Sequence, residues 1–103
     1  MTARPPKGKH PQLVLCLYLA GDSPNSALAK THLRTAIAHL AKEDVTLELV
    51  DVLRDPARGL RDGVLVTPTL VRVAPTPEQR VIGNLRDRSA LLAGLGISEV
   101  GRE

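Results

Sequence analysis

Few residues of this chain have the types and spacing that catalysis or metal binding requires. The only thiol is that of Cys16, which lies in the middle of the apolar run 13–20. Burial there would raise the thiol pKa and suppress its nucleophilicity, so we expect Cys16 to be a core residue. His32 and His39 are seven residues apart, whereas two histidines on one helix share a metal at a spacing of four. We predict that both histidines face solvent and that no metal is bound.

The carboxylates Asp51, Asp55 and Asp62 are close enough in the sequence to suggest paired groups for acid/base chemistry. Two of them stand at expected helix ends, and each has an ordinary role as a helix cap or a solvated surface group. The glycines Gly94 and Gly96 are too closely spaced for a phosphate-binding loop and follow the wrong element. We therefore predict no catalytic constellation and no cofactor.

Composition indicates one soluble globular domain without a nucleic-acid partner. The chain has 103 residues, of which 43% are hydrophobic and 24% are charged. Tyr18 is the only aromatic residue, so stacking platforms for single-stranded nucleic acid are absent. The net charge of +3 comes from Arg4, Lys7 and Lys9 in the first ten residues, because the remaining 93 residues balance at 11 basic against 11 acidic. A basic excess confined to one short segment does not predict a nucleic-acid surface.

Three segments are expected: a flexible basic tail over 1–12, a domain over 13–97 and a C-terminal tail over 98–103. The first segment has no apolar stretch of the kind a signal peptide needs, and the longest apolar run, 13–20, is far below the roughly 20 residues of a membrane span. A lone cysteine forms no internal disulfide and fits a reducing compartment. We expect a cytoplasmic protein that contacts no membrane.

The first half of the domain predicts a strand, a helix and a second strand. The apolar run 13–20 shows no alternation, which is typical of a strand covered on both faces. Ser23 can cap a helix whose first residue is Pro24, and apolar residues then recur at helical spacing to about Lys42. Residues 45–52 alternate and are rich in β-branched types, so they predict a strand nearer an edge. The order implies a right-handed crossover between parallel strands.

The second half of the domain is less regular. Asp55 and Pro56 repeat the cap-then-proline signal, and we expect a short helix ending at Gly63, although the run 64–66 is strand-like. Residues 69–74 and 79–83, separated by a proline-rich turn, predict an antiparallel hairpin. Asp87 caps a last helix with apolar Ala90, Leu91, Leu92 and Leu95.

The order βαβαββα is that of the thioredoxin-like fold, and an α/β domain of this type is our predicted fold class. The sequence Thr67-Pro68-Thr69-Leu70 resembles the segment in which that fold carries a cis proline, so we expect Pro68 to be cis. The catalytic Cys-x-x-Cys of that fold starts its first helix, where the helix dipole stabilises a thiolate. Here Ser23-Pro24-Asn25-Ser26 stands in its place, so the redox position holds no sulfur.

Four ordered motifs resemble those of the KaiB family of bacterial clock proteins. They are 17–26 (LYLAGDSPNS), 50–56 (VDVLRDP), 67–70 (TPTL) and 80–88 (RVIGNLRDR). The resemblance runs without gaps from about Leu13 to Leu95. The N-terminal domain of the sensor kinase SasA shares the fold and some of these features.

The resemblance implies a non-enzymatic regulator that binds the N-terminal ring of the ATPase KaiC and modulates its phosphorylation and ATPase cycle. KaiA or a SasA-type kinase are further implied partners. Carried over from the family, Arg72, Arg80 and Arg88 would be basic contacts to KaiC. Leu28 and Glu48 stand where the family usually has Arg and Lys, which implies that the basic contacts differ here.

The resemblance also implies two folds. KaiB proteins exchange between a ground-state fold βαββααβ, often a dimer or tetramer, and a thioredoxin-like monomer. Gly94 and Gly96 would be switch residues, since each glycine costs roughly 1 kcal/mol inside a helix. We accordingly expect alanine at both positions to favour the thioredoxin-like state. The strand-like run 64–66 independently suggests that this half can pack in two ways.

Two rival functions remain open on sequence alone. One is a thiol oxidoreductase using Cys16, against which Ser23 and Ser26 argue. The other is a redox-inactive thioredoxin-like adaptor that docks on a histidine kinase.

Overall fold

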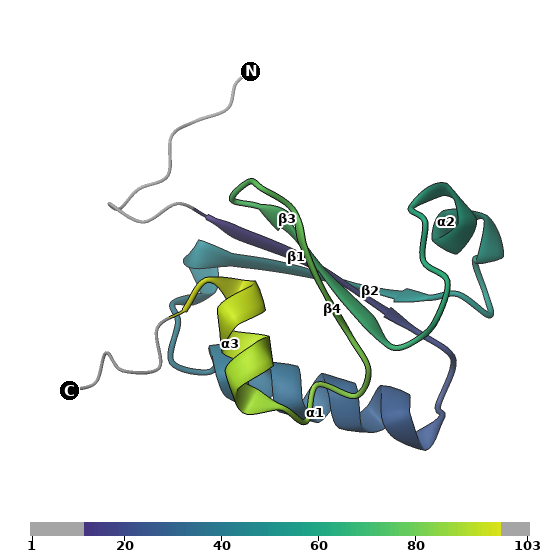
Figure 1. The fold of residues 1–103 in the computed structure, drawn as a ribbon, viewed down its shortest axis with the longest axis horizontal. Helices are drawn as coiled ribbons and strands as arrows, with labels where there is room; N and C mark the ends of the chain where they lie inside the picture. Colours follow the sequence, from purple (N-terminus) through teal and green to yellow (C-terminus); the bar gives the residue numbers. More distant parts are fainter. Residues whose placement is uncertain (1–11, 98–103) are drawn as a thin grey trace.

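The computed structural model describes residues 12–97, so the expected tails, apart from Gln12, lie outside the described residues. The elements follow the predicted order, with one added turn of 3₁₀ helix, η1 (Figure 1). They are β1 (Leu13–Leu19), α1 (Pro24–Ile37), η1 (Lys42–Asp44), β2 (Val45–Asp51), α2 (Pro56–Arg61), β3 (Thr69–Ala74), β4 (Gln79–Ile82) and α3 (Arg88–Leu95).

The sheet has the strand order β2-β1-β3-β4. β1 pairs with β2 in parallel and with β3 in the antiparallel sense, and β3 and β4 form the predicted hairpin. The predictions that 13–20 is a central strand and that the second strand lies at an edge are therefore confirmed. The thioredoxin-like fold class is also confirmed at the level of element order and topology.

The main core lies between the sheet and the helices α1 and α3, which lie on the same side of it (Figure 1). Because side chains alternate along a strand, every second residue of β1 points into this core. Its buried members are Leu13, Leu15, Leu17, Leu19, Ala29, Leu33, Ala36, Leu70, Leu85, Leu91, Leu92 and Leu95. α2 lies apart from these helices, near the ends of β1 and β2 (Figure 1). We call the side of the sheet that α2 adjoins the α2 face.

Helix α1 begins as predicted but ends earlier. Ser23 is its N-cap and Pro24 its first residue, as the sequence indicates. The helix stops at Ile37 rather than near Lys42, because Ala38 closes it with a bond to the Thr35 carbonyl and a turn follows. Leu40 packs against the core from that turn. Its apolar character is therefore explained by burial and not by membership of the helix.

The strand-like run 64–66 forms no strand. Gly63, with φ of +71°, turns the chain after α2, and the Val64 amide then donates to the Gly59 carbonyl at 2.9 Å. Leu65 and Val66 are 91% and 50% exposed. The predicted short helix is confirmed, but it ends at Arg61 rather than at Gly63.

Helix α3 corrects one expectation about glycine. Gly96 is not inside the helix: it follows it with φ of +78°, and the Ile97 amide donates back to the Leu92 carbonyl at 2.9 Å, as in a Schellman cap. A Cβ at Gly96 would lie 2.7 Å from an Arg72 Nη1 atom, and one at Gly94 would collide with Val81 Cγ2. The expectation that alanine at both positions favours this fold is therefore wrong, because glycine is required here by space and by backbone conformation.

Three peptide bonds before proline are cis, at Thr67–Pro68, Ala74–Pro75 and Thr76–Pro77. The bond expected from the Thr67-Pro68-Thr69 sequence is among them. The other two lie at the turn that connects β3 to β4.

Candidate functional site

The start of α1 is built as a helix cap. Ser23 Oγ accepts from the Ser26 amide at 3.3 Å and donates to Ser26 Oγ at 2.9 Å. Ser26, which is fully buried, accepts in turn from the Ala20 amide at 3.0 Å. Both hydroxyls at the expected redox position, those of Ser23 and Ser26, are thus hydrogen-bonded within the turn between β1 and α1. This position contains no thiol.

Cys16 is a core residue, as predicted. It is 4% exposed and belongs to a small apolar cluster on the α2 face with Tyr18, Val50 and Val71. Burial raises the pKa of the Cys16 thiol, and a hydrogen bond with Tyr18 offsets this only in part. The nearest cationic group is Arg58, whose Nη2 lies 3.9 Å from the sulfur. A buried, protonated thiol is a poor nucleophile.

The two histidines differ. His39 is exposed as expected, but the expectation for His32 is wrong: it is half-buried, and its Nδ1–H donates to the Asn84 carbonyl at 2.7 Å. That bond joins α1 to the loop before α3. Across residues 12–97, no group of His, Cys, Asp and Glu side chains could hold a metal ion.

The three arginines predicted to contact a partner do not share a surface. Arg72 is 9% exposed and donates to the Pro77 carbonyl at 2.8 Å, on the side of the sheet that α1 and α3 cover. Arg80 pairs with Val71 across the hairpin and so lies on the α2 face. Arg88 is the exposed first residue of α3. A direct contact to a partner therefore suits Arg80 and Arg88 better than Arg72.

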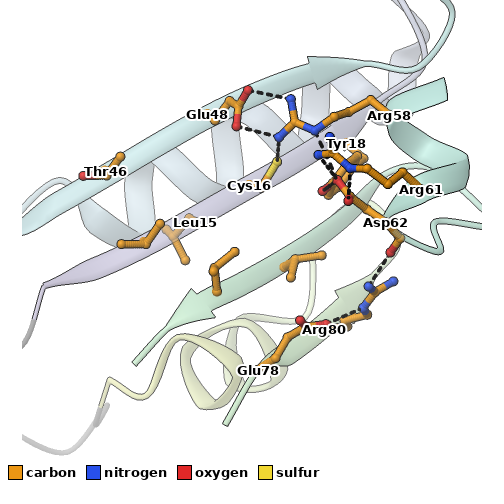
Figure 2. A pocket seen from close by; sticks show the side chains of 13 residues that line it. Leu15, Cys16, Tyr18, Thr46, Glu48, Arg58, Arg61, Asp62, Glu78 and Arg80 are labelled. Atoms are coloured by element: carbon orange, nitrogen blue, oxygen red, sulfur yellow. Dashed lines mark hydrogen bonds and ion pairs between the residues drawn. The ribbon is translucent and has the colours of Figure 1, made fainter. Parts of the chain in front are cut away.

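The α2 face carries an open hollow of about 580 Å³ (Figure 2). Its floor is apolar, and includes Val14, Cys16, Val71 and Val73 from β1 and β3. Its walls are charged, and include Glu48, Arg58, Arg61, Asp62, Glu78 and Arg80. Of these six residues, only Glu48, Asp62 and Arg80 were singled out from the sequence, each separately, whereas the structure gathers all six around one hollow.

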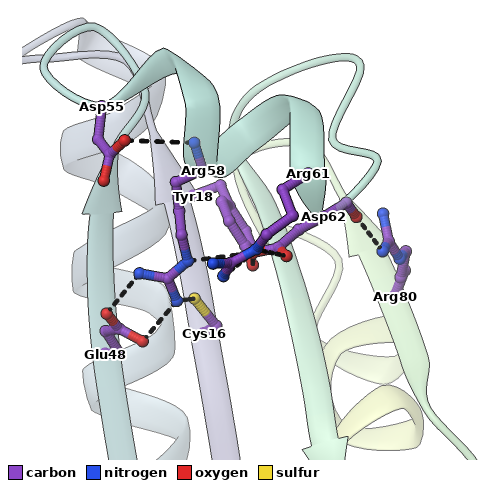
Figure 3. Close-up of polar contacts among 8 residues, drawn as sticks. All are labelled: Cys16, Tyr18, Glu48, Asp55, Arg58, Arg61, Asp62 and Arg80. Carbon is purple, nitrogen blue, oxygen red and sulfur yellow. Dashed lines mark hydrogen bonds and ion pairs between the residues drawn. The ribbon is translucent and has the colours of Figure 1, made fainter.

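A network of charged hydrogen bonds joins α2 to the sheet (Figure 3). Arg58 binds both carboxylate oxygens of Glu48, at 2.8 and 2.7 Å, and its Nε donates to Asp62 at 3.2 Å. The Tyr18 hydroxyl donates to the same Asp62 oxygen at 2.5 Å, and Arg61 Nε donates to the other at 3.0 Å. Asp62 thus stands at the end of α2 as expected, but its carboxylate is the centre of the network and not a solvated surface group.

The network holds its carboxylates ionised. The guanidinium of Arg61 and the hydroxyl of Tyr18 donate to Asp62 and lower the pKa of its carboxyl, and Arg58 likewise lowers the pKa of Glu48. Burial and the bond to Asp62 raise the pKa of the Tyr18 phenol, so it stays a donor. Arg58 and Asp62 are four positions apart across the end of α2, and this spacing is a sequence signal that could have indicated part of the network. Nothing local in the sequence points to Tyr18 or Glu48.

An apolar patch lies beside the network, at α2 and the loop after it. Leu60, Leu65 and Val66 are 79%, 91% and 50% exposed, and we call these three residues the α2 patch. They border a hollow of about 330 Å³ whose other lining residues include Val52, Pro56 and Val64. Arg54 and Arg61, from the same segment, have side chains that are 86% and 67% exposed.

Together, the fold and the site define a thioredoxin-like α/β domain in which serines replace the redox cysteines. Comparison with known proteins is more specific. The family model described as "KaiB domain" matches residues 16–97, and the chain belongs to the KaiB family. Within residues 12–97, no helix has the length and apolar character needed to traverse a bilayer.

Curated relatives agree with this assignment. The chain is 42% identical over 84 residues to the circadian clock oscillator protein KaiB of Prochlorococcus marinus strain SARG, covering 82% of this chain and 72% of that protein. It is 40% identical over 84 residues to the KaiB of Gloeothece citriformis, covering 82% and 79%.

Solved structures support the fold alone. The N-terminal domain of Synechococcus elongatus SasA has a TM-score of 0.67 at 24% identity, covering 96% of this chain and 97% of that one. Mitochondrial thioredoxin 3 of Saccharomyces cerevisiae has a TM-score of 0.67 at 22% identity, covering 85% and 80%.

Proposed function

We propose that this chain is a non-enzymatic clock regulator that binds the N-terminal ATPase ring of KaiC and modulates its phosphorylation and ATPase cycle. The observation that carries the proposal is the match to the KaiB domain over residues 16–97. The protein acts in the cytoplasm, and KaiA or a SasA-type kinase are further partners. Arg80 and Arg88 contact KaiC directly, while Arg72, which is buried, makes no direct contact with KaiC.

The α2 patch is a suitable docking surface for such a partner. Large apolar side chains that are 79% and 91% exposed cost free energy in water, and grouped around a hollow they are typical of a protein–protein contact. Leu60 and Leu65 supply the apolar anchors, and the exposed guanidiniums of Arg54 and Arg61 favour an acidic partner surface.

The test is size-exclusion chromatography of the protein with KaiC and nucleotide. We expect the wild-type chain to elute with KaiC and Leu65→Asp to lose at least about ten-fold in affinity, as for an interface anchor. The control is Leu49→Asp on β2, where the same change is made at a residue that is 41% exposed outside the α2 patch. A wild-type chain that elutes alone under all nucleotide conditions overturns the proposal. Equal binding by Leu65→Asp and wild type overturns the docking surface only.

The alternative is a redox-inactive adaptor that docks on a histidine kinase. It is favoured by the likeness in fold to the SasA N-terminal domain. The same column run with the kinase in place of KaiC separates the two functions, and light scattering on the free chain measures whether it is a monomer, dimer or tetramer.

A further inference from the structure

Helix α2 has little apolar contact to hold it in place. It has six residues, from Pro56 to Arg61, and a helix this short is not stable alone in water. Gly59 is the one residue of α2 that is buried, against the side chain of Val52 just after β2, and Val64 just beyond the helix packs partly buried against the small cluster on the α2 face. Leu60, its largest apolar residue, points into solvent. Burial of apolar surface is therefore not the main force that positions α2.

Charged hydrogen bonds from three strands take this role (Figure 3). From β2, Glu48 accepts two bonds from Arg58. From β1, Tyr18 donates to Asp62, directly after the helix. From β4, Arg80 donates to the carbonyls of Asp62 at 2.6 Å and Gly63 at 3.1 Å.

Three of these groups are largely shielded from water, which makes their bonds effective. The side chains of Arg58 and Asp62 are each 23% exposed, and Tyr18 is 3% exposed. Water competes weakly at such sites, and paired, charge-assisted bonds are stronger there than on an open surface. The main core, in contrast, lies on the other side of the sheet, so α2 can detach while that core stays packed.

We propose that Tyr18, Glu48, Arg58 and Asp62 form a latch that positions α2 on the sheet and thereby sets the affinity of the α2 patch for its partner. The partner in this statement rests on the proposed function, whereas the positioning of α2 does not. Only the closed latch presents Leu60 and Leu65 in the docking geometry. The apparent dissociation constant is then the intrinsic constant divided by the fraction of molecules in which the latch is closed.

The first measurement is amide hydrogen exchange by NMR, which needs no partner. The amides of Asp62 and Val64, bonded to the carbonyls of Arg58 and Gly59, report on α2, and the amides of β1 report on the core. Two variants open the latch with small changes in shape: Glu48→Gln and Tyr18→Phe. The control is Glu43→Gln, which removes an exposed carboxylate on η1, before β2.

We expect exchange at Asp62 and Val64 to be several-fold faster in each latch variant and faster still in the double variant, while β1 amides and the control stay at wild-type rates. Unchanged exchange at both amides in both variants overturns the latch. If Tyr18→Phe fails to fold, Glu48→Gln still decides, because Glu48 has a side chain that is 53% exposed and its loss leaves the core intact.

The second measurement is the affinity for KaiC. The closed fractions obtained from exchange should predict the ratio of dissociation constants, reaching about ten-fold weaker binding when roughly 90% of the molecules are open. Tyr18→Phe is the decisive variant, because a hydroxyl on a residue 3% exposed makes no direct contact with a partner. If a variant opens the latch but binds KaiC with unchanged affinity, the latch does not set the affinity of the α2 patch. Absence of binding by the wild type overturns the proposed function, and the latch is then judged by exchange alone.

Discussion

Cys16 and Asp62 show how burial and partners decide what a side chain can do. The thiol was correctly predicted from the sequence to be a core group, because an uninterrupted apolar run around it predicts burial. The carboxylate was not recognised, because its role depends on Tyr18, which is 44 positions away in the sequence. His32 was missed for the same reason, since the Asn84 carbonyl that it binds is 52 positions away.

The first prediction is that Cys16 takes no part in redox chemistry. Cys16→Ala should leave both KaiC affinity and any thiol–disulfide exchange unchanged, because a lone buried thiol has neither an activating group nor a resolving partner. The free energy of unfolding of the Cys16→Ala variant should be lower by about 1 kcal/mol, because packing around the side chain is lost. The measurement is an insulin reduction assay with chemical denaturation alongside. Reductase activity that disappears in Cys16→Ala would instead support the oxidoreductase alternative.

The second prediction reverses the expectation that the sequence raised for Gly94 and Gly96. Gly94→Ala should destabilise the thioredoxin-like fold by about 1 to 3 kcal/mol, because the new methyl group collides with Val81. Gly96→Ala should cost about 1 kcal/mol or more, from a positive φ and from contact with Arg72. Denaturant unfolding measures both. The matched control is Ser89→Ala on the exposed side of α3, and a gain in stability at either glycine would contradict the structure.

At the scale of elements, local signals predicted where the helices start better than where α1 ends. Ser23, Asp55 and Asp87 cap α1, α2 and α3 as the sequence indicates, because a cap depends on residues within one turn. The end of α1 was predicted too late because Leu40 continues the apolar spacing and packs against the core, although it lies beyond the helix. The run 64–66 was ambiguous because exposed apolar residues have no periodic signal of their own.

The third prediction concerns acid. Glu48 and Asp62 have pKa values below their ordinary ones, so the latch contributes stability above those ordinary values and loses it as the pH falls through the lowered ones. Arg58 and Arg61, whose pKa values are raised by their carboxylate partners, stay charged throughout. We therefore expect α2 to detach progressively below about pH 4, near the ordinary carboxyl pKa, before the core unfolds.

Exchange at the Asp62 and Val64 amides, corrected for intrinsic rate, measures this opening against pH. The comparison variant is Glu48→Gln, which lacks one of the titrating groups and should show a flatter dependence. Equal pH dependence of the α2 and β1 amides would show that α2 does not open separately.

At the scale of the whole molecule, the two halves of the domain differ in how firmly they are specified. The strand–helix–strand half has long periodic patterns, and the structure matches them. The second half has a six-residue helix, an exposed apolar loop and a four-residue edge strand, and the polar latch holds part of it. A half held by few contacts is the one in which a second packing costs least, which agrees with the two folds that the resemblance implies.

The last prediction tests whether the free chain exchanges between folds. If KaiC binds only the thioredoxin-like state, exchange into that state limits binding, and a slow phase independent of KaiC concentration should appear. The double variant Gly94→Ala/Gly96→Ala destabilises this state, so it should bind more weakly, by about ten-fold for each 1.4 kcal/mol when that state is the minor one. Stopped-flow mixing with KaiC measures both effects, with Ser89→Ala as the control. A single phase that scales with KaiC concentration in all three proteins would mean that the free chain is already thioredoxin-like, and Gly94 and Gly96 would then serve only the packing of α3.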